Sequence, residues 1–363
     1  MEQELFAYWL YTLRGIGAKK RHELQQIYGN AEQIYYGDKT KLKESPVFSE
    51  QDKTLLGKPE TVKEIKHKMQ RMEQRGIRFC SQESEAFPKK LRYIPDPPYA
   101  LFYRGMLPDT DRPAIAIVGG RNTGYESREI AAGFGRQLAE NGIAVVSGLA
   151  RGIDISAQKG ALDIPGGKTY GVLGTGVDIC YPREHIEQYM LMQRRGAVIS
   201  EYAPGRGFRS NFARRNRIIS GLSDGVLVIA AREGSGSLIT AECALEQGKE
   251  VFIVPGNILD PSYAGGNQLL KSGAAVVTDI QDILDGLGAF WDINYSAQKK
   301  KNEVMLETAE KIVYAILGFD GIHISEIVAQ TGFSVPQTME VLASLEQKKL
   351  VNMVGQHYYA LKI

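Results

Sequence analysis

The segment Ile115–Gly124 reads IAIVGGRNTG, an apolar run that ends in a glycine-rich turn. Further short apolar runs follow as far as Asp279, rich in β-branched residues and separated by segments of helical length. The runs are IAIVG (115–119), IAVVSG (143–148), TYGVLG (169–174), AVISEY (197–202), GVLVIAA (225–231), EVFIVPG (250–256) and AAVVTD (274–279). Because they are continuously apolar rather than alternating, they are typical of strands covered on both faces.

This repeated strand–helix pattern predicts an α/β fold with a doubly wound, mostly parallel, Rossmann-like sheet over residues 76–292. Residues 1–75, rich in Lys, Gln and Glu, are predicted to form a small helical domain. Between the first helices and the first apolar run, FPKKLRYIPDPPYALFYRG (87–105) is expected to be an extended connection. Residues 293–302 are predicted to be a polar linker, and residues 303–363 a winged-helix-like domain.

The N-terminal helices contain a Gly-Ile-Gly turn that precedes Lys19, Lys20 and Arg21. This arrangement resembles a helix-hairpin-helix or SAM-like domain, in which backbone amides can face a phosphate. Alternatively, Gly15 and Gly17 only permit a tight turn between two helices. The sequence leaves both interpretations open.

The composition is that of an ordinary soluble protein, with 363 residues, 43% of them hydrophobic, 24% charged, and a net charge of +2. Three scattered cysteines suit a reducing compartment, and no histidine pair has the spacing of a helical zinc site. We therefore expect no metal. The acidic N-terminus and the lack of a long apolar run predict a cytoplasmic protein without a membrane segment.

The C-terminal segment 303–363 carries four lysines against seven acidic residues, a net charge of −3. A protein that binds duplex DNA needs a basic surface. This segment is therefore expected to contact a protein.

The glycine-rich turns do not match the motifs of nucleotide cofactors. In VGGRNTG, Arg121 occupies the position of the middle glycine of a dinucleotide fingerprint. In GGKT, Leu162 stands where the phosphate loop of an NTPase needs its first glycine. We therefore expect no cofactor. The turns at the strand ends still expose backbone amides at helix N-termini, which favours an oxyanion or phosphate ligand.

The stretch NFARRNRIIS (211–220) completes a basic segment: five arginines and no acidic residue lie between Arg206 and Arg217. A solvated, salt-bridged helix face would normally interleave acids. Phe212 lies among these arginines, and an aromatic ring beside guanidiniums is how proteins grip single-stranded nucleic acid. Phe212 stacks on a base in this interpretation; in the alternative it is a core residue of the helix.

Several blocks together resemble the DNA-processing protein A (DprA/Smf) family. They are SGLARGIDISAQKGAL (147–162), GVLGTGVDICYPREH (171–185), ISEYAPG (199–205), the long block from Asn211 to Ile258, and GGNQLLKSGA (265–274). The resemblance implies a non-catalytic protein that binds single-stranded DNA and protects it during natural transformation. It also implies that the protein helps to load the RecA recombinase and forms a homodimer through the Rossmann domain.

Transferred to this chain, the resemblance implies a DNA-binding pocket at the strand ends. Phe212 would stack on a base, three arginines would bind phosphates, and Asn216 would form hydrogen bonds. The implied site residues are Gly120, Arg121, Ser147, Gly148, Lys168, Phe212, Arg214, Arg215, Asn216, Arg217, Ser235, Gly236 and Ser237.

Two other functions are compatible with the sequence. The turn REGSGSLITAE, with Glu242, resembles the PGGxGTxxE turn of LOG-type nucleotide phosphoribohydrolases, so hydrolysis of a nucleotide is one alternative. The other is an adaptor whose helical ends bind partners while the sheet domain is a scaffold.

Overall fold

The computed structural model divides into two compact units, Met1–Asp292 and Ile293–Ile363, and each has its own hydrophobic core. The residues that it describes are 2–43, 45–109, 112–207, 211–288, 307–318, 321–348 and 350–361. The predicted linker at 293–302 lies outside these residues. No helix in the described ranges combines the length and apolar character that a transmembrane segment requires.

The first unit contains a nine-stranded sheet with the strand order β1-β2-β6-β5-β4-β3-β7-β8-β9. The strands from β3 to β9 pair in parallel, and each coincides with one of the apolar runs, which confirms the predicted parallel sheet. These strands are β3 Ala114–Gly119, β4 Ala144–Ser147, β5 Thr169–Val172, β6 Ala197–Ser200, β7 Gly225–Ile229, β8 Glu250–Ile253 and β9 Ala275–Val276.

Two further strands extend the sheet beyond β6. They are β1 Arg78–Ser81 and β2 Ala100–Gly105; β2 pairs antiparallel with both β1 and β6. The expectation of an extended connection at 87–105 was therefore wrong in part, because this stretch forms the short helix α6 (Lys89–Arg92) and β2. The pairing of Phe102 with Ser200 shows why: the partner of β2 lies far along the sequence, where a local pattern does not register it.

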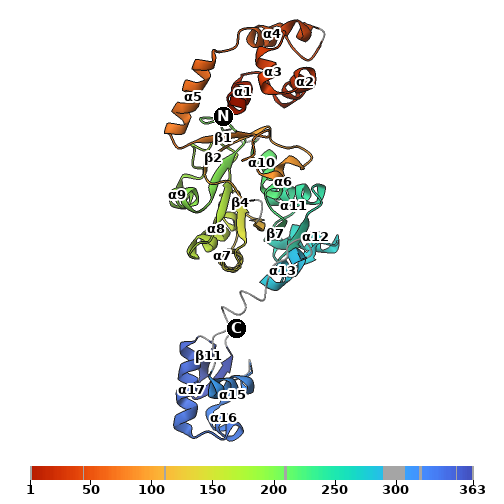
Figure 1. The fold of residues 1–363 in the computed structure, drawn as a ribbon. Coiled ribbons are helices and arrows are strands. Elements are labelled where there is room, and N and C mark those ends of the chain that lie inside the picture. Colours follow the sequence, from red (N-terminus) through yellow and green to blue (C-terminus); the bar gives the residue numbers. More distant parts are fainter. Residues whose placement is uncertain are drawn as a thin grey trace. The chain divides into compact units, whose positions relative to one another are not determined.

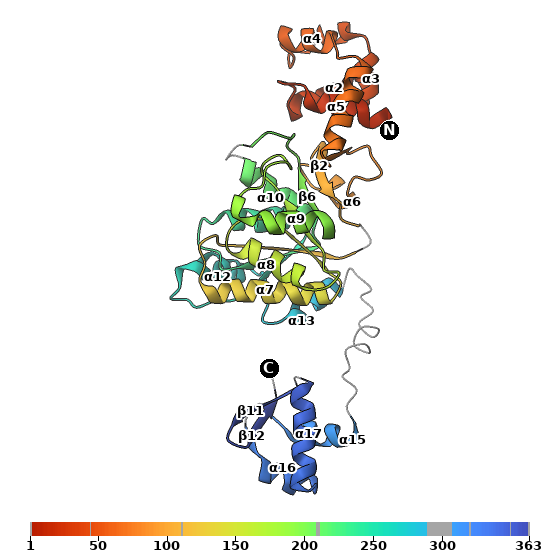
Figure 2. The ribbon, with the colours of Figure 1, turned by 90° about the vertical axis from the view of Figure 1, so that its left-hand side faces the viewer.

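Helices cover both faces of this sheet (Figures 1 and 2). One layer contains α7 Tyr125–Glu140, α8 Ile153–Asp163, α9 Ile186–Arg195 and α13 Ile280–Gly288; the other contains α10 Asn211–Gly221, α11 Gly236–Glu246 and α12 Ala264–Lys271. Along β3, Ala116 and Val118 face the second layer and pack near Ile218 of α10. The connections diverge at β3, since β4 and β7 lie on opposite sides of it. Such a divergence opens a crevice at the carboxyl ends of the strands.

The N-terminal helices pack on the β1–β2 edge of the sheet. They are α1 Glu2–Thr12, α2 Ala18–Tyr28, α3 Ala31–Tyr36, the 3-10 helix η1 Lys39–Lys43, α4 Glu50–Gly57 and α5 Val62–Gln74. The rings of Tyr8 and Tyr11 on α1 contact Phe79 of β1 and Phe102 of β2. Helices and sheet edge therefore share one continuous core, and this places α2 within the same compact unit as the sheet.

The second unit is a small α/β structure. It contains α15 Thr308–Ile316, β10 Ile322–His323, α16 Ile324–Thr331, α17 Val335–Gln347, β11 Val351–Gly355 and β12 Tyr358–Leu361. Its strands pair in the order β10-β12-β11, and Ile327, Leu342 and Tyr359 belong to its core. The order of helices followed by a hairpin is that expected from the sequence, with β10 as an added short strand.

Candidate functional site

A cavity of about 340 Å³ opens at the carboxyl ends of β3, β4 and β7, between α10 and α11. We call it the strand-end pocket. It is lined by Arg121 from the turn after β3, Asp154 at the start of α8, Phe212 and Arg215 from α10, and Gly236 at the start of α11. It lies where the connections of the doubly wound sheet diverge, which is the usual ligand position in this type of fold.

The turns around this pocket have constrained backbones. Leu149 follows β4 with φ of 56° and Ala230 follows β7 with φ of 48°, although neither is glycine. Residues held in this region concentrate at functional sites. Gly152 has φ of 76°, and a Cβ added to it would lie 2.3 Å from the carbonyl oxygen of Gly120. The turns after β3 and β4 therefore touch and fix one another.

Arg121 and Phe212 meet at the mouth of the pocket. Arg121 is exposed, and its Cζ lies 5.9 Å from the centre of the Phe212 ring. The ring is half-buried, packs against Gly174, and lies 5.6 Å from the ring of Tyr181. Phe212 is thus neither a core residue nor a freely exposed one. The exposed ring of Tyr181 is a site feature that the sequence analysis missed, although Tyr181 belongs to the GVLGTGVDICYPREH block.

Arg215 is buried and holds two strand ends together. Its guanidinium donates hydrogen bonds to the carbonyl oxygens of Gly148 and Val172. Burial lowers the pKa of Arg215 to about 10, so that it remains charged at neutral pH. Nearby, the Gly148 amide donates to the carboxylate of Asp154 at 3.0 Å, and burial raises the pKa of Asp154. Arg215 therefore lies on the pocket wall, but its guanidinium binds backbone carbonyl oxygens of the protein itself.

Ser147 is buried as well. Its hydroxyl donates to the carbonyl oxygen of Ile117 at 2.6 Å and so joins β4 to β3. Together with the hydrogen bonds of Gly148, this contact holds the turn after β4 in place beside the pocket. Gly120 lies beside Arg121, where its amide donates to the carbonyl oxygen of Ala230. Both turns are therefore tied to neighbouring strand ends.

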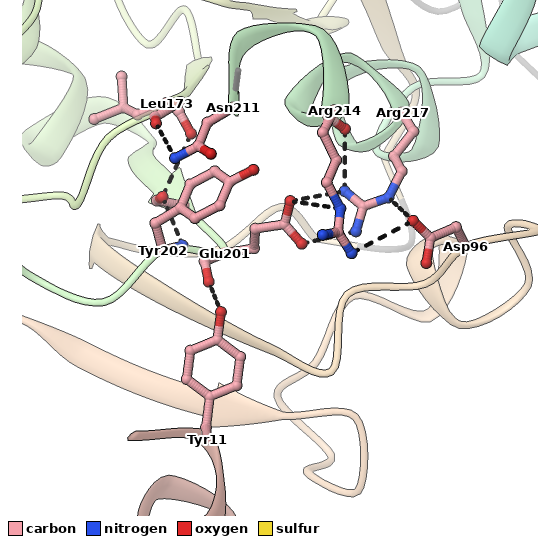
Figure 3. A network of polar contacts seen from close by, with 10 residues as sticks. Tyr11, Asp96, Leu173, Glu201, Tyr202, Asn211, Arg214 and Arg217 are labelled. Carbon is pink, nitrogen blue, oxygen red and sulfur yellow. Dashed lines mark hydrogen bonds and ion pairs between the residues drawn. The ribbon is translucent and has the colours of Figure 1, made fainter. Parts of the chain in front are cut away.

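Arg214 and Arg217 lie on a different side of α10 from Phe212 and Arg215, and they do not line the strand-end pocket. Arg217 is buried and forms two parallel hydrogen bonds with Glu201, at 2.7 and 3.0 Å, and one with Asp96 at 2.8 Å. Arg214 approaches these carboxylates only at 3.8 and 3.9 Å. Figure 3 shows both guanidiniums directed at Glu201, with Asp96 completing the network.

This network revises the interpretation of the arginine stretch. The acids that are missing between Arg206 and Arg217 are supplied by Asp96 and Glu201, which precede the stretch in the sequence. The charge of Arg217 is therefore paired with carboxylates of the protein itself, whereas the side chain of Arg214 is half-exposed. The stretch from 208 to 210, which includes Phe208, lies outside the described residues.

Asn216 and the Ser235–Ser237 turn join α10 to α11. The Asn216 side-chain amide donates to the carbonyl oxygen of Gly236 at 3.0 Å. Ser235 is the N-cap of α11, and its hydroxyl accepts from the amide of Ser237. Neither α10 nor α11 has an acidic residue in its first turn. Two helix N-termini with unopposed positive dipole ends thus flank the pocket, as an anionic ligand requires.

Lys168 does not belong to this site. It directly precedes β5, and it lines a separate cavity with Arg112 and Gly142, at the amino ends of the strands. The prediction that it lies near the pocket was wrong, because the pocket is at the opposite, carboxyl edge of the parallel strands.

The pocket gives little support to nucleotide hydrolysis. Glu242, on which that alternative depends, is exposed and does not line the pocket. Among the described residues that line it, Asp154 is the only carboxylate, and backbone amides of the turn after β4 occupy it. In the parts of the chain that are described, no group of three or more His, Cys, Asp or Glu residues is placed to hold a metal ion.

Comparison with known proteins gives consistent matches. The family model described as DNA recombination-mediator protein A matches residues 78–288. The chain is 36% identical to Protein Smf of Escherichia coli over 301 residues, which span 80% of this chain and 79% of that protein. These matches confirm the family resemblance predicted from the motifs.

Two solved structures are also similar. That of DNA processing protein A from Streptococcus pneumoniae has a TM-score of 0.65 and 32% identity, and the match covers 78% of this chain and 97% of that one. A structure of DNA processing protein A from Helicobacter pylori, described for its single-stranded DNA binding mode, has a TM-score of 0.52 and 30% identity. That match covers 58% of this chain and 96% of the other.

Proposed function

This chain belongs to the DNA recombination-mediator protein A family, and from that membership and the pocket we propose that it binds single-stranded DNA. In this proposal the strand-end pocket holds a short stretch of the strand. The proposal also assigns the protein to the processing of DNA in transformation and recombination, where it protects incoming DNA.

The observation that supports this function most directly is the contact between Arg121 and Phe212 at the pocket mouth. An unpaired base can stack on the half-exposed ring, while the guanidinium and the N-termini of α10 and α11 attract the phosphates. In a duplex the base faces are already stacked, so the ring favours a single strand. No covalent step is needed for this role, and we propose that the protein is not an enzyme.

Most of the predicted site residues around the strand-end pocket have one of two roles in this proposal. Arg121, Phe212 and the Ser235–Ser237 turn contact the strand. Ser147, Gly148, Arg215 and Asn216 hold the surrounding turns in place through bonds inside the protein. Such internal support fixes the contacting groups before the ligand arrives, which lowers the entropic cost of binding.

The remaining roles are proposals that rest on the resemblance to the family. We propose that the protein helps to load RecA onto the bound strand and forms a homodimer through its sheet domain. We also propose that the helices within 1–75 form a helix-hairpin-helix or SAM-like domain, and that the second unit is a winged helix. The net charge of −3 over residues 303–363 favours a protein partner over DNA for that segment.

The test is a titration of the full-length protein with a labelled single-stranded oligothymidylate and with a duplex of equal length, at several salt concentrations. We expect tighter binding of the single strand, and we expect the logarithm of the affinity to fall linearly with the logarithm of the salt concentration. Equal affinity for both forms, or affinity without salt dependence, contradicts the proposal. Release of free base from nucleoside monophosphates would favour the hydrolase alternative instead.

A further inference from the structure

A second cavity, of about 370 Å³, lies between α2, the segment 96–99 and the α10 face that carries Arg214. We call it the junction cavity. Four basic residues line it, Lys19, Arg21, Arg214 and Arg217, against two acidic ones, Asp96 and Glu201. Arg217 binds both acids at 2.7 to 3.0 Å. Arg214 lies 3.8 and 3.9 Å from the same two acids, so the two arginines balance them and the surplus of two positive charges falls on Lys19 and Arg21.

The three consecutive basic residues at the start of α2, Lys19, Lys20 and Arg21, have different contacts. Lys20 is paired with Asp52 at 2.7 Å. The Arg21 guanidinium lies beside the rings of Tyr11 and Tyr99, 4.7 and 5.3 Å from their centres. Lys19 is exposed on the cavity wall. Only Lys19 and Arg21 thus bring their charge to the junction cavity.

The position of Arg21 has an unfavourable component that an anion would relieve. Its Nε atom is buried without a hydrogen-bond partner in the described part of the chain, and so is the hydroxyl of Tyr99. Burial lowers the pKa of Arg21, which reflects the cost of removing this charge from water. A negative charge in the cavity would offset that cost.

Helix α10 separates the two cavities. Phe212, Arg215 and Asn216 line the strand-end pocket, whereas Arg214 and Arg217 line the junction cavity. The first turn of α10 contributes to both, with Phe212 at the pocket and Arg214 at the junction cavity, and it contains no acidic residue. A polyanion held at the strand-end pocket can therefore pass over this end and meet Arg214, then Lys19.

We propose that the junction cavity is a second subsite for a backbone phosphate of the same single strand that occupies the strand-end pocket. The inference rests on the proposed function, since a strand must first be bound at the pocket. Arg214 and Lys19 contact the phosphate, and Arg21 supplies fixed charge behind them. The subsite gives the N-terminal helices a direct part in DNA binding.

The test uses the full-length protein and a length series of oligothymidylates, titrated between about 50 and 200 mM salt. For strands long enough to pass α10, Lys19→Ala and Arg214→Ala are each expected to lower the slope of log affinity against log salt by about 0.7. For the shortest strands that bind, the Lys19→Ala slope should equal that of the wild type. Lys66→Ala, an exposed lysine on α5 outside the cavity, is the matched control and should change neither slope.

Three results would overturn the subsite. An unchanged slope of Lys19→Ala with long strands excludes a phosphate contact there. An equal loss with Lys66→Ala shows a general charge effect, and an equal loss for short and long strands shows an indirect effect on the pocket. In each of these cases the wild type still binds short strands, so the proposed function survives. If the wild type binds no single strand of any length, the proposed function itself fails.

Discussion

Arg217 and Arg214 are neighbours on α10 with different expected roles. The Arg217 side chain is 10% exposed and its partner Glu201 is 8% exposed, so removing the guanidinium leaves a buried carboxylate without its cation. We expect Arg217→Ala to lower the free energy of unfolding by about 3–5 kcal/mol. Arg214 is half-exposed, and Arg214→Ala should cost less than about 1 kcal/mol. Urea denaturation followed by circular dichroism measures both; equal losses would contradict this division.

Phe212 gives the corresponding prediction for binding. If its ring stacks on a base, Phe212→Ala should weaken the binding of single-stranded DNA by about 1–3 kcal/mol, while Phe212→Trp should retain most of the affinity. Anisotropy titration of both variants makes the comparison. A folded Phe212→Ala variant with unchanged affinity would show that the ring only packs against Gly174 and Tyr181.

At the scale of elements, the turns after β3 and β4 should act as one rigid support. In Gly152→Ala, the new Cβ would meet the carbonyl oxygens of Gly120 and Arg121 at 2.3 and 2.7 Å. The turn that carries Arg121 must then shift, so we expect a loss of affinity for single-stranded DNA.

Gly166→Ala is the matched control for this substitution. Gly166 has φ of 79°, close to that of Gly152, but a Cβ there has no neighbour within 4 Å. Both variants carry a backbone penalty of about 1–2 kcal/mol, and only Gly152→Ala should lose affinity. If both bind DNA equally well, the contact between the turns does not position Arg121.

The elements also show what the sequence can and cannot predict. The strands from β3 to β9 are continuous apolar runs, because a parallel sheet covered on both faces imposes that pattern locally. Strand β2 was missed because its strand character depends on pairing with β6, far along the chain. The arginine stretch was only partly understood for the same reason. Its pattern predicts a cationic helix, but Asp96 and Glu201, which neutralise Arg217, reach it only through the fold.

At the scale of the whole molecule, the second unit has its own ion pair, in which a partly exposed lysine meets a buried carboxylate. Glu310 accepts hydrogen bonds from Lys348 and Ser344, and these bonds lower its pKa to about 2 from an ordinary value of 4.5. A carboxyl whose pKa is lower in the folded than in the unfolded chain stabilises the fold when the pH is above the pKa of the unfolded chain. This contribution is lost as the pH falls from about 4.5 toward 2.

We therefore expect hydrogen-exchange protection of α15 and α17 to decrease in this acidic range, after correction for intrinsic exchange rates. Glu310→Gln should have lower protection at neutral pH and a weaker dependence on pH. The same pH dependence in Glu310→Gln as in the wild type would show that another group is responsible.

The central claim for the whole molecule is that a single DNA strand lies in the strand-end pocket of the first unit. Ultraviolet crosslinking of the full-length protein to an oligothymidylate, followed by mass spectrometry of the crosslinked peptides, locates the strand directly. We expect crosslinks at Phe212 and Tyr181, whose rings lie 5.6 Å apart at the pocket mouth. Crosslinks confined to the second unit, with none on the peptides that carry these two rings, would contradict it.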